Sequence, residues 1–151
     1  MKRAIQAFVF SLALSICAAA DSTNPSLLQI RRVLDKPSAD SDELSFQQNE
    51  LNVAKTPSLD LAAVKSASAI TNVFSGEPVV DITLTAEGAK QFARLTRENI
   101  GRQLAVVVDG KVMCAPIIRE PITGGEMQIS AHFGEQEAKN LAAKLNAAIA
   151  K

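Results

Sequence analysis

Two stretches of the chain carry apolar residues at intervals of three and four, the spacing that places them on one face of a helix. The first stretch follows Thr85, whose hydroxyl suits the first free amides of a helix, and Gly101 is placed to end it. Its apolar face consists of Ala89, Phe92, Ala93, Thr96 and Ile100. The second stretch runs from about Glu135 to Ala150, with an apolar face of Ala138, Leu141, Ala142, Leu145, Ala148 and Ile149. The spacing therefore predicts two long helices.

Other segments have the pattern of strands. Apolar and polar residues alternate through Val79–Leu84, the period of a half-buried strand. The dipeptide Asp109-Gly110 suits a two-residue turn and predicts a hairpin of Leu104–Val108 with Lys111–Ile118, in which Pro116 marks an edge or a bulge. Further strands are predicted at Leu27–Leu34, Glu50–Lys55, Ala67–Phe74 and Met127–Ala131.

These elements predict an α+β fold in which two long helices cover one face of a mainly antiparallel sheet. From Val79 onward their order is compatible with a ferredoxin-like arrangement. Turn-forming residues at Asp35–Asp42 predict a polar loop, and Ser58 or Asp60 is expected to cap one helical turn through Val64. Ser75–Pro78 is expected to join two strands as a hairpin.

The first twenty residues read as a secretory signal peptide, cleaved near Ala20. Lys2 and Arg3 precede an apolar stretch that is shorter than the roughly 20 residues needed to span a bilayer. The alternative is a lipoprotein signal with Cys17 as the lipid-attachment site, which the bulky Ile16 disfavours. We expect a periplasmic or secreted mature chain without a transmembrane segment.

Charge and cysteine content narrow the classes of function. The chain has 16 basic and 16 acidic residues, and cleavage after Ala20 would remove Lys2 and Arg3 and leave a net charge near −2. Such a chain, without a basic stripe, is not expected to bind nucleic acid. Cys114 would be the one remaining cysteine, which excludes an intrachain disulfide.

No arrangement of reactive residues indicates an enzyme, a metal site or a cofactor. His132 is the one histidine, and we expect it to cap or flank the last helix. Cys114 lies among apolar residues and is expected to act as a small buried hydrophobe. Gly124-Gly125 lacks the lysine and hydroxyl of a phosphate-binding loop, so this pair is expected to be structural, and Gly88 is expected to allow close packing. Four arginines either gather near the hairpin or lie on a solvated face: Arg94, Arg97, Arg102 and Arg119.

Three sequence motifs resemble those of one known family. They are Ala86–Phe92 (AEGAKQF), Val108–Val112 (VDGKV), and Ala115–Ile118 (APII) followed by Ile122–Gly125 (ITGG). Together they resemble the head of the first periplasmic domain of SecD, a membrane subunit that assists preprotein export. With the signal peptide expected at 1–20, the resemblance leaves an N-terminal strand and polar loop at 21–49 and a SecD-head-like domain at 50–151. The membrane helices of SecD have no counterpart before Lys151, so a standalone exported domain is expected.

The resemblance implies a non-enzymatic domain that contacts polypeptide or the export machinery, assisting translocation or the handling of chains after export. Contact of this kind uses sheet edges and modest apolar patches. The candidate contact residues are Pro116, Arg119, Glu120, Ile122, Thr123, Gly124 and Gly125. The alternative is an interaction module for one dedicated folded partner or a small ligand, unrelated to transport.

Overall fold

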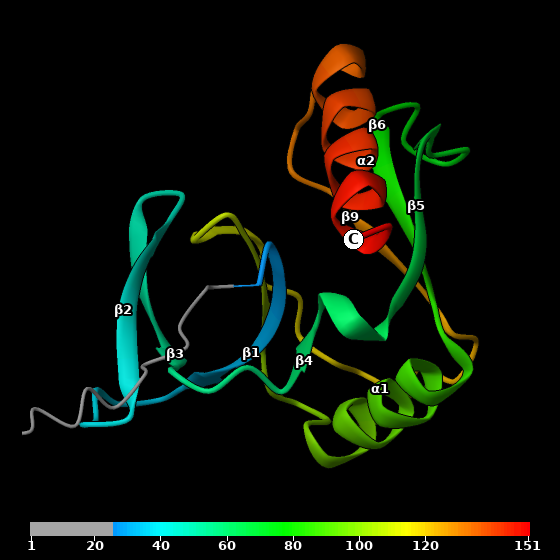
Figure 1. Ribbon diagram of the computed structural model, residues 1–151. Helices are drawn as coiled ribbons and strands as arrows, with labels where there is room; N and C mark the ends of the chain where they lie inside the picture. Colours follow the sequence, from blue (N-terminus) through cyan, green and yellow to red (C-terminus); the bar gives the residue numbers. More distant parts are fainter. Residues whose placement is uncertain (1–25) are drawn as a thin grey trace, which may run out of the picture.

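The computed structural model describes residues 26–151. The signal peptide expected at residues 1–20, its cleavage near Ala20 and the alternative lipid site at Cys17 lie outside the described residues. Two long helices and two antiparallel sheets make up the described part (Figure 1). None of the helices between residues 26 and 151 is both long and apolar enough to cross a membrane.

The first sheet has the strand order β2-β3-β1-β7-β8, and the short β4 also pairs with β1. Its strands are β1 (Leu28–Leu34), β2 (Ser41–Phe46), β3 (Asn49–Ala54), β4 (Leu59–Asp60), β7 (Leu104–Val108) and β8 (Lys111–Cys114). β2, at one end of this order, contacts β8 at the other end, so the sheet curls. The curl encloses a small apolar cluster built on Val53, Ala105, Val107 and Val112.

β7 is buried at all five positions because its two faces belong to two cores. Ala105 and Val107 point into the cluster inside the curl, whereas Leu104, Val106 and Val108 point into the larger core. This explains why the sequence of β7 is continuously apolar and does not alternate.

The second sheet has the order β5-β6-β9, from β5 (Val64–Thr71), β6 (Pro78–Leu84) and β9 (Glu126–Ile129). The helix α2 (Glu135–Ile149) packs on β5 and β6 (Figure 1). Asn146 of α2 bonds the edge of β5: its amide nitrogen donates to the Ala67 carbonyl at 2.7 Å, and its oxygen accepts from the Ala67 N–H at 2.8 Å. A side chain thus satisfies a peptide group that would otherwise be open to another strand.

The helix α1 (Ala86–Glu98) begins against the single helical turn η1 (Leu61–Ala63). The Thr85 hydroxyl accepts from the Gly88 N–H at 3.0 Å, and the Asp60 carboxylate caps η1, as expected. A Cβ on Gly88 would lie 2.3 Å from the Ala63 carbonyl oxygen, so only glycine allows this contact. The packing role expected for Gly88 is confirmed.

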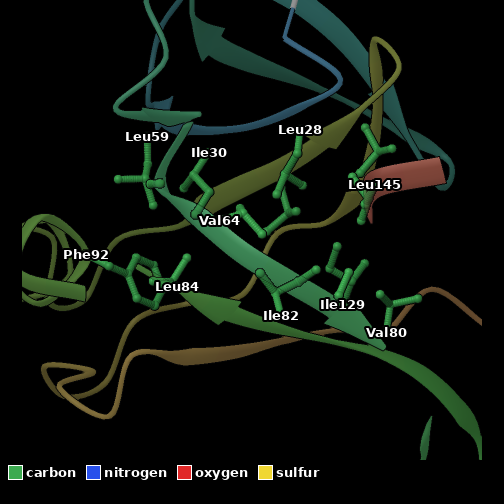
Figure 2. Packing of buried hydrophobic residues seen from close by; sticks show 14 of the residues in the cluster. Leu28, Ile30, Leu59, Val64, Val80, Ile82, Leu84, Phe92, Ile129 and Leu145 are labelled. Atoms are coloured by element: carbon green, nitrogen blue, oxygen red, sulfur yellow. The ribbon is translucent and has the colours of Figure 1, made fainter. Parts of the chain in front are cut away.

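The main core fills the space between the two sheets. Leu28 and Ile30 of the first sheet face Val80 and Ile82 of the second, as Figure 2 shows. Phe92 of α1 lies at one end of this layer, and Leu145 of α2 lies toward the other. Both helices therefore share one core with both sheets.

The predicted α+β class, the two helices and the antiparallel pairing are confirmed. The Asp109-Gly110 turn is confirmed as well, with φ of 52° and 77° at its two residues. The strands are divided between two sheets, however, where the sequence pattern suggested one. The end of the polar loop predicted at residues 35–42 belongs to β2, and the strand predicted to end at Phe74 stops at Thr71. Phe74 is 97% exposed in the turn that follows.

Candidate functional site

The segment between β8 and β9, residues 115–125, crosses from one sheet to the other and is anchored along its length. The Ile118 N–H donates to the Arg102 carbonyl at 2.9 Å, and the Gly101 N–H donates to the Ile118 carbonyl at 2.7 Å. The Leu104 N–H donates to the Pro116 carbonyl at 3.1 Å. This crossover segment is therefore tied to the chain that joins α1 to β7.

A buried threonine fixes the second half of the crossover segment. The Thr96 hydroxyl donates to the Phe92 carbonyl within α1 at 2.9 Å and accepts from the Ile122 N–H, also at 2.9 Å. Gly125 has a φ of 70°, and a Cβ there would lie 3.1 Å from the Ala89 side chain. The crossover segment is held in one conformation against α1.

Beneath the crossover segment lies an apolar pocket of about 120 Å³. Its lining residues come from β1, α1, β7, β8, the crossover segment and β9: Ile30, Phe92, Leu104, Val106, Cys114, Pro116, Ile118, Ile122, Met127 and Gln128. Pro116 and Gln128 are exposed and mark the opening. Because an apolar cavity of about 150 Å³ accepts a benzene ring, this pocket matches one medium-sized apolar side chain.

Cys114 contributes a half-buried thiol to the pocket wall. Burial raises the pKa of the Cys114 thiol, and a hydrogen bond with the backbone of Ser130 offsets part of that effect. A thiol that stays protonated is a weak nucleophile, so this residue is suited to packing, as the sequence indicated.

The strand β9 presents an open edge beside the pocket. The Leu84 N–H donates to the Gly125 carbonyl at 2.8 Å, and the register continues with Ile82 opposite Met127. Because antiparallel strands alternate the direction of their peptide groups, those of Glu126 and Gln128 point away from β6. The contact of Cys114 with the Ser130 backbone lies on that same side. Among residues 26–151 no strand pairs with this edge.

The candidate contact residues named from the sequence fall into three groups. Pro116 and Ile122 line the pocket. Arg119, Glu120, Thr123 and Gly124 lie exposed on the outer side of the crossover segment, and Gly125 is buried against α1. Sequence reasoning missed the pocket's inner wall and the β9 edge. The apolar face of α1, which includes Phe92, was the available signal.

His132 and the acidic side chains are the other residues that the sequence offered for reactive chemistry. His132 is largely exposed just before α2, 3.9 Å from a carboxylate oxygen of Glu77, so it flanks that helix as expected. In the part of the chain that the structure describes, no three histidine, cysteine or acidic side chains gather as a metal site would require. The arrangement supports binding through shape, apolar contact and open backbone groups.

The fold is a small α+β domain that has an apolar pocket and, among residues 26–151, an unpaired sheet edge at β9. Residues 35–149 match the family model described as "SecDF, P1 head subdomain". This match covers most of the chain, and the chain therefore belongs to the SecDF P1 head family.

Named relatives and solved structures agree with that assignment. The chain is 38% identical over 122 residues to the protein translocase subunit SecDF of Thermus thermophilus, covering 80% of this chain and 16% of that protein. It is 42% identical over 109 residues to SecD of Treponema pallidum, covering 72% of this chain and 18% of the relative. A crystal structure of SecDF in a super-membrane-facing form superimposes with a TM-score of 0.66 and 31% identity, covering 78% of this chain and 18% of that one. A SecDF structure described as a membrane component that enhances protein export gives a TM-score of 0.63 and 31% identity, covering 78% of this chain and 60% of that one. The chain spans about a sixth of the length of the curated relatives.

Proposed function

We propose that this domain is a non-enzymatic, exported polypeptide-binding head that assists protein translocation or the handling of chains after export. The observation that carries the proposal is the apolar pocket lying directly beside the open edge of β9. An extended segment would add to β9 through backbone hydrogen bonds and place one apolar side chain in the pocket. The relatives are named translocase subunits, which supports a ligand that is itself a polypeptide.

This mode of binding suits a ligand of varied sequence. Backbone hydrogen bonds to Glu126 and Gln128 would be available to any extended chain, and the pocket would select only an apolar side chain. The anchored crossover segment reduces the ordering cost of binding, because its backbone is already fixed by Thr96 and Arg102. The interaction module for one folded partner would instead use a larger, less adaptable surface.

Fluorescence anisotropy with a labelled ten-residue peptide of alternating valine and threonine tests the proposal. We expect saturable binding, and we expect Ile122→Glu to weaken it by about tenfold or more, because the charge would stand in the pocket opening. Ile117→Glu is the matched control, since Ile117 lies on the same crossover segment, is 55% exposed and does not line the pocket. Equal loss in both variants, or no binding by the parent protein, would contradict the proposal.

A second measurement does not depend on the stability of the Ile122 variant. Cys114 lies in the pocket wall, so a bound peptide is expected to slow its reaction with a thiol reagent. In cells, photo-crosslinking groups at Glu126 and Gln128 are expected to capture many different exported chains or the translocation channel. A group at Glu87, on the exposed first turn of α1, is the control. Capture of one recurrent folded protein would favour the dedicated-partner alternative.

A further inference from the structure

Three arginines converge on an open hollow of about 610 Å³, separate from the apolar pocket. Arg32 comes from β1, Arg94 from α1, and Arg102 from the chain between α1 and β7. Thr56 and Ser58 add hydroxyl groups from the chain between β3 and β4. We name this feature the arginine hollow. Three of the six arginines between residues 26 and 151 face it.

Several basic side chains among residues 26–151 form ion pairs. Arg31 pairs with Asp42 at 3.0 Å, and Lys144 pairs with Asp109 at 3.0 Å. Within residues 26–151, none of the three hollow arginines makes an ion pair. Glu98 is the one acidic residue of the lining, so the hollow carries a formal excess of two positive charges.

The backbone that carries these arginines is fixed by hydrogen bonds. Arg32 stands opposite Leu104 in the register of β1 and β7. The Arg102 carbonyl accepts from Ile118, and the Arg102 N–H donates to the Asn99 carbonyl at 3.0 Å. The Ser58 N–H donates to the Ile30 carbonyl at 2.8 Å, which holds the opposite rim on β1. The three arginine side chains therefore extend toward the hollow from a backbone that is fixed before any ligand arrives.

We propose that the arginine hollow binds an acidic segment of polypeptide through its carboxylates. A guanidinium group matches a carboxylate with two parallel hydrogen bonds, and three such groups suit a segment with several acidic side chains. The hollow is too large for one small anion and is open, which suits a chain that passes across it. The inference rests on the proposed polypeptide-binding function but uses a different surface and different chemistry.

Anisotropy with a labelled peptide of alternating glutamate and serine tests this inference against a peptide in which glutamine replaces glutamate. We expect the double variant Arg94→Gln, Arg102→Gln to weaken binding of the acidic peptide by about tenfold or more. The double variant Arg97→Gln, Arg119→Gln removes the same charge from exposed positions outside the hollow, and it is expected to change binding by less than about threefold. Glu98→Gln is expected to tighten binding. Equal loss in the two double variants, or equal binding of both peptides, would overturn the inference.

Inorganic phosphate separates a carboxylate site from a phosphate site. At matched ionic strength, phosphate is expected to displace the acidic peptide no better than chloride does. Displacement by phosphate alone would assign the arginine hollow to phosphate groups and overturn the carboxylate proposal. If the alternating valine and threonine peptide binds and the acidic peptide does not, only this inference fails. If neither peptide binds, the proposed function fails with it.

Discussion

The apolar pocket and the arginine hollow share two elements, β1 and α1, yet one is lined by apolar side chains and the other carries three arginines. Ile30 lines the pocket, and Arg32, two residues further along β1 on the same face, lines the hollow. On α1, Phe92 faces the pocket and Arg94 faces the hollow. The pocket walls are part of the hydrophobic core, whereas the hollow is a surface. Substitutions of the core residues that line the pocket are therefore expected to lower stability, whereas substitutions of the three exposed arginines in the hollow are expected to affect mainly binding.

The largest effect is expected for the pair Phe92→Ala and Arg94→Ala. Phe92 is 4% exposed and packs in the main core, so its loss is expected to lower the free energy of unfolding by about 3–5 kcal/mol. Arg94 is exposed and unpaired among the described residues, so its loss is expected to change that free energy by less than about 0.5 kcal/mol. Urea denaturation of both variants checks the contrast. Similar decreases in the free energy of unfolding of the two variants would contradict the distinction between the pocket wall in the core and the hollow at the surface.

A smaller effect is expected where α1 meets η1. Gly88→Ala would force a methyl group toward the Ala63 carbonyl oxygen, and we expect a loss of about 1–3 kcal/mol in the free energy of unfolding. Gly124→Ala is the matched control, because nothing lies within 4 Å of a Cβ at that position. Thermal unfolding followed by circular dichroism measures both. If the free energy of unfolding of Gly88→Ala is unchanged, α1 can shift without cost. The residues of α1 that line the pocket and the hollow would then shift with it.

Thr96→Val tests how firmly the pocket opening is held. Valine keeps the shape of threonine but leaves the Ile122 N–H without its acceptor, so we expect a loss of about 1–3 kcal/mol in the free energy of unfolding. Hydrogen exchange of the Ile122 amide is expected to accelerate more than that of amides in β7. Thr96→Ser retains the hydroxyl and is expected to preserve slow exchange. Equal exchange rates in both variants would show that this hydrogen bond does not hold the crossover segment.

The smallest effect concerns pH and two residues of β2 and β3 that line neither the apolar pocket nor the arginine hollow. The neighbouring carboxylate of Glu50 raises the pKa of Glu43 above its ordinary value of 4.5, through a hydrogen bond and charge repulsion. The folded state therefore holds this proton more tightly than the unfolded state, and the resulting stabilisation is lost as the pH rises through the folded pKa.

Glu50→Gln removes the repulsion, so the variant is expected to be slightly more stable than the parent protein at pH 7. The advantage is expected to disappear below pH 4.5, the ordinary value for Glu43. Glu135→Gln is expected to change stability in the opposite direction. Lys139 lowers the pKa of Glu135, so the loss of that pair should destabilise the protein at pH 7 only. Thermal unfolding at both pH values distinguishes the two. If the stability difference between Glu50→Gln and the parent protein does not vary with pH, Glu50 is not the cause of the raised pKa of Glu43.

The boundary predicted at residue 50 remains a prediction, and the fold supplies its test. Leu28 and Ile30 of β1 lie in the main core, and β1 pairs with β7 along five residues. We therefore expect residues 50–151 alone to lack cooperative unfolding, whereas residues 26–151 unfold in one transition.

Local sequence patterns predicted the structure correctly where the conformation of a segment depends on residues close to it in the chain. The spacing of apolar residues placed both helices, Thr85 capped the first, and Asp109-Gly110 formed the expected turn. The same patterns failed for β2, which is only half-buried and rich in polar residues, so its sequence resembles a loop. They also failed at the end of β5, because apolar Val73 and Phe74 stand in an exposed turn.

The amino-acid sequence was sufficient to predict the class of fold, the family, and the position of the segment that joins β8 to β9. The folded structure was needed to show how the strands divide between two sheets and which residues meet around the apolar pocket and the arginine hollow. Helix faces, caps and turns depend on residues that are close neighbours in the chain, so a local sequence pattern can predict them. Pocket walls, open edges and unpaired charges depend on contacts between residues such as Ile30, Phe92 and Met127, which lie far apart in the sequence.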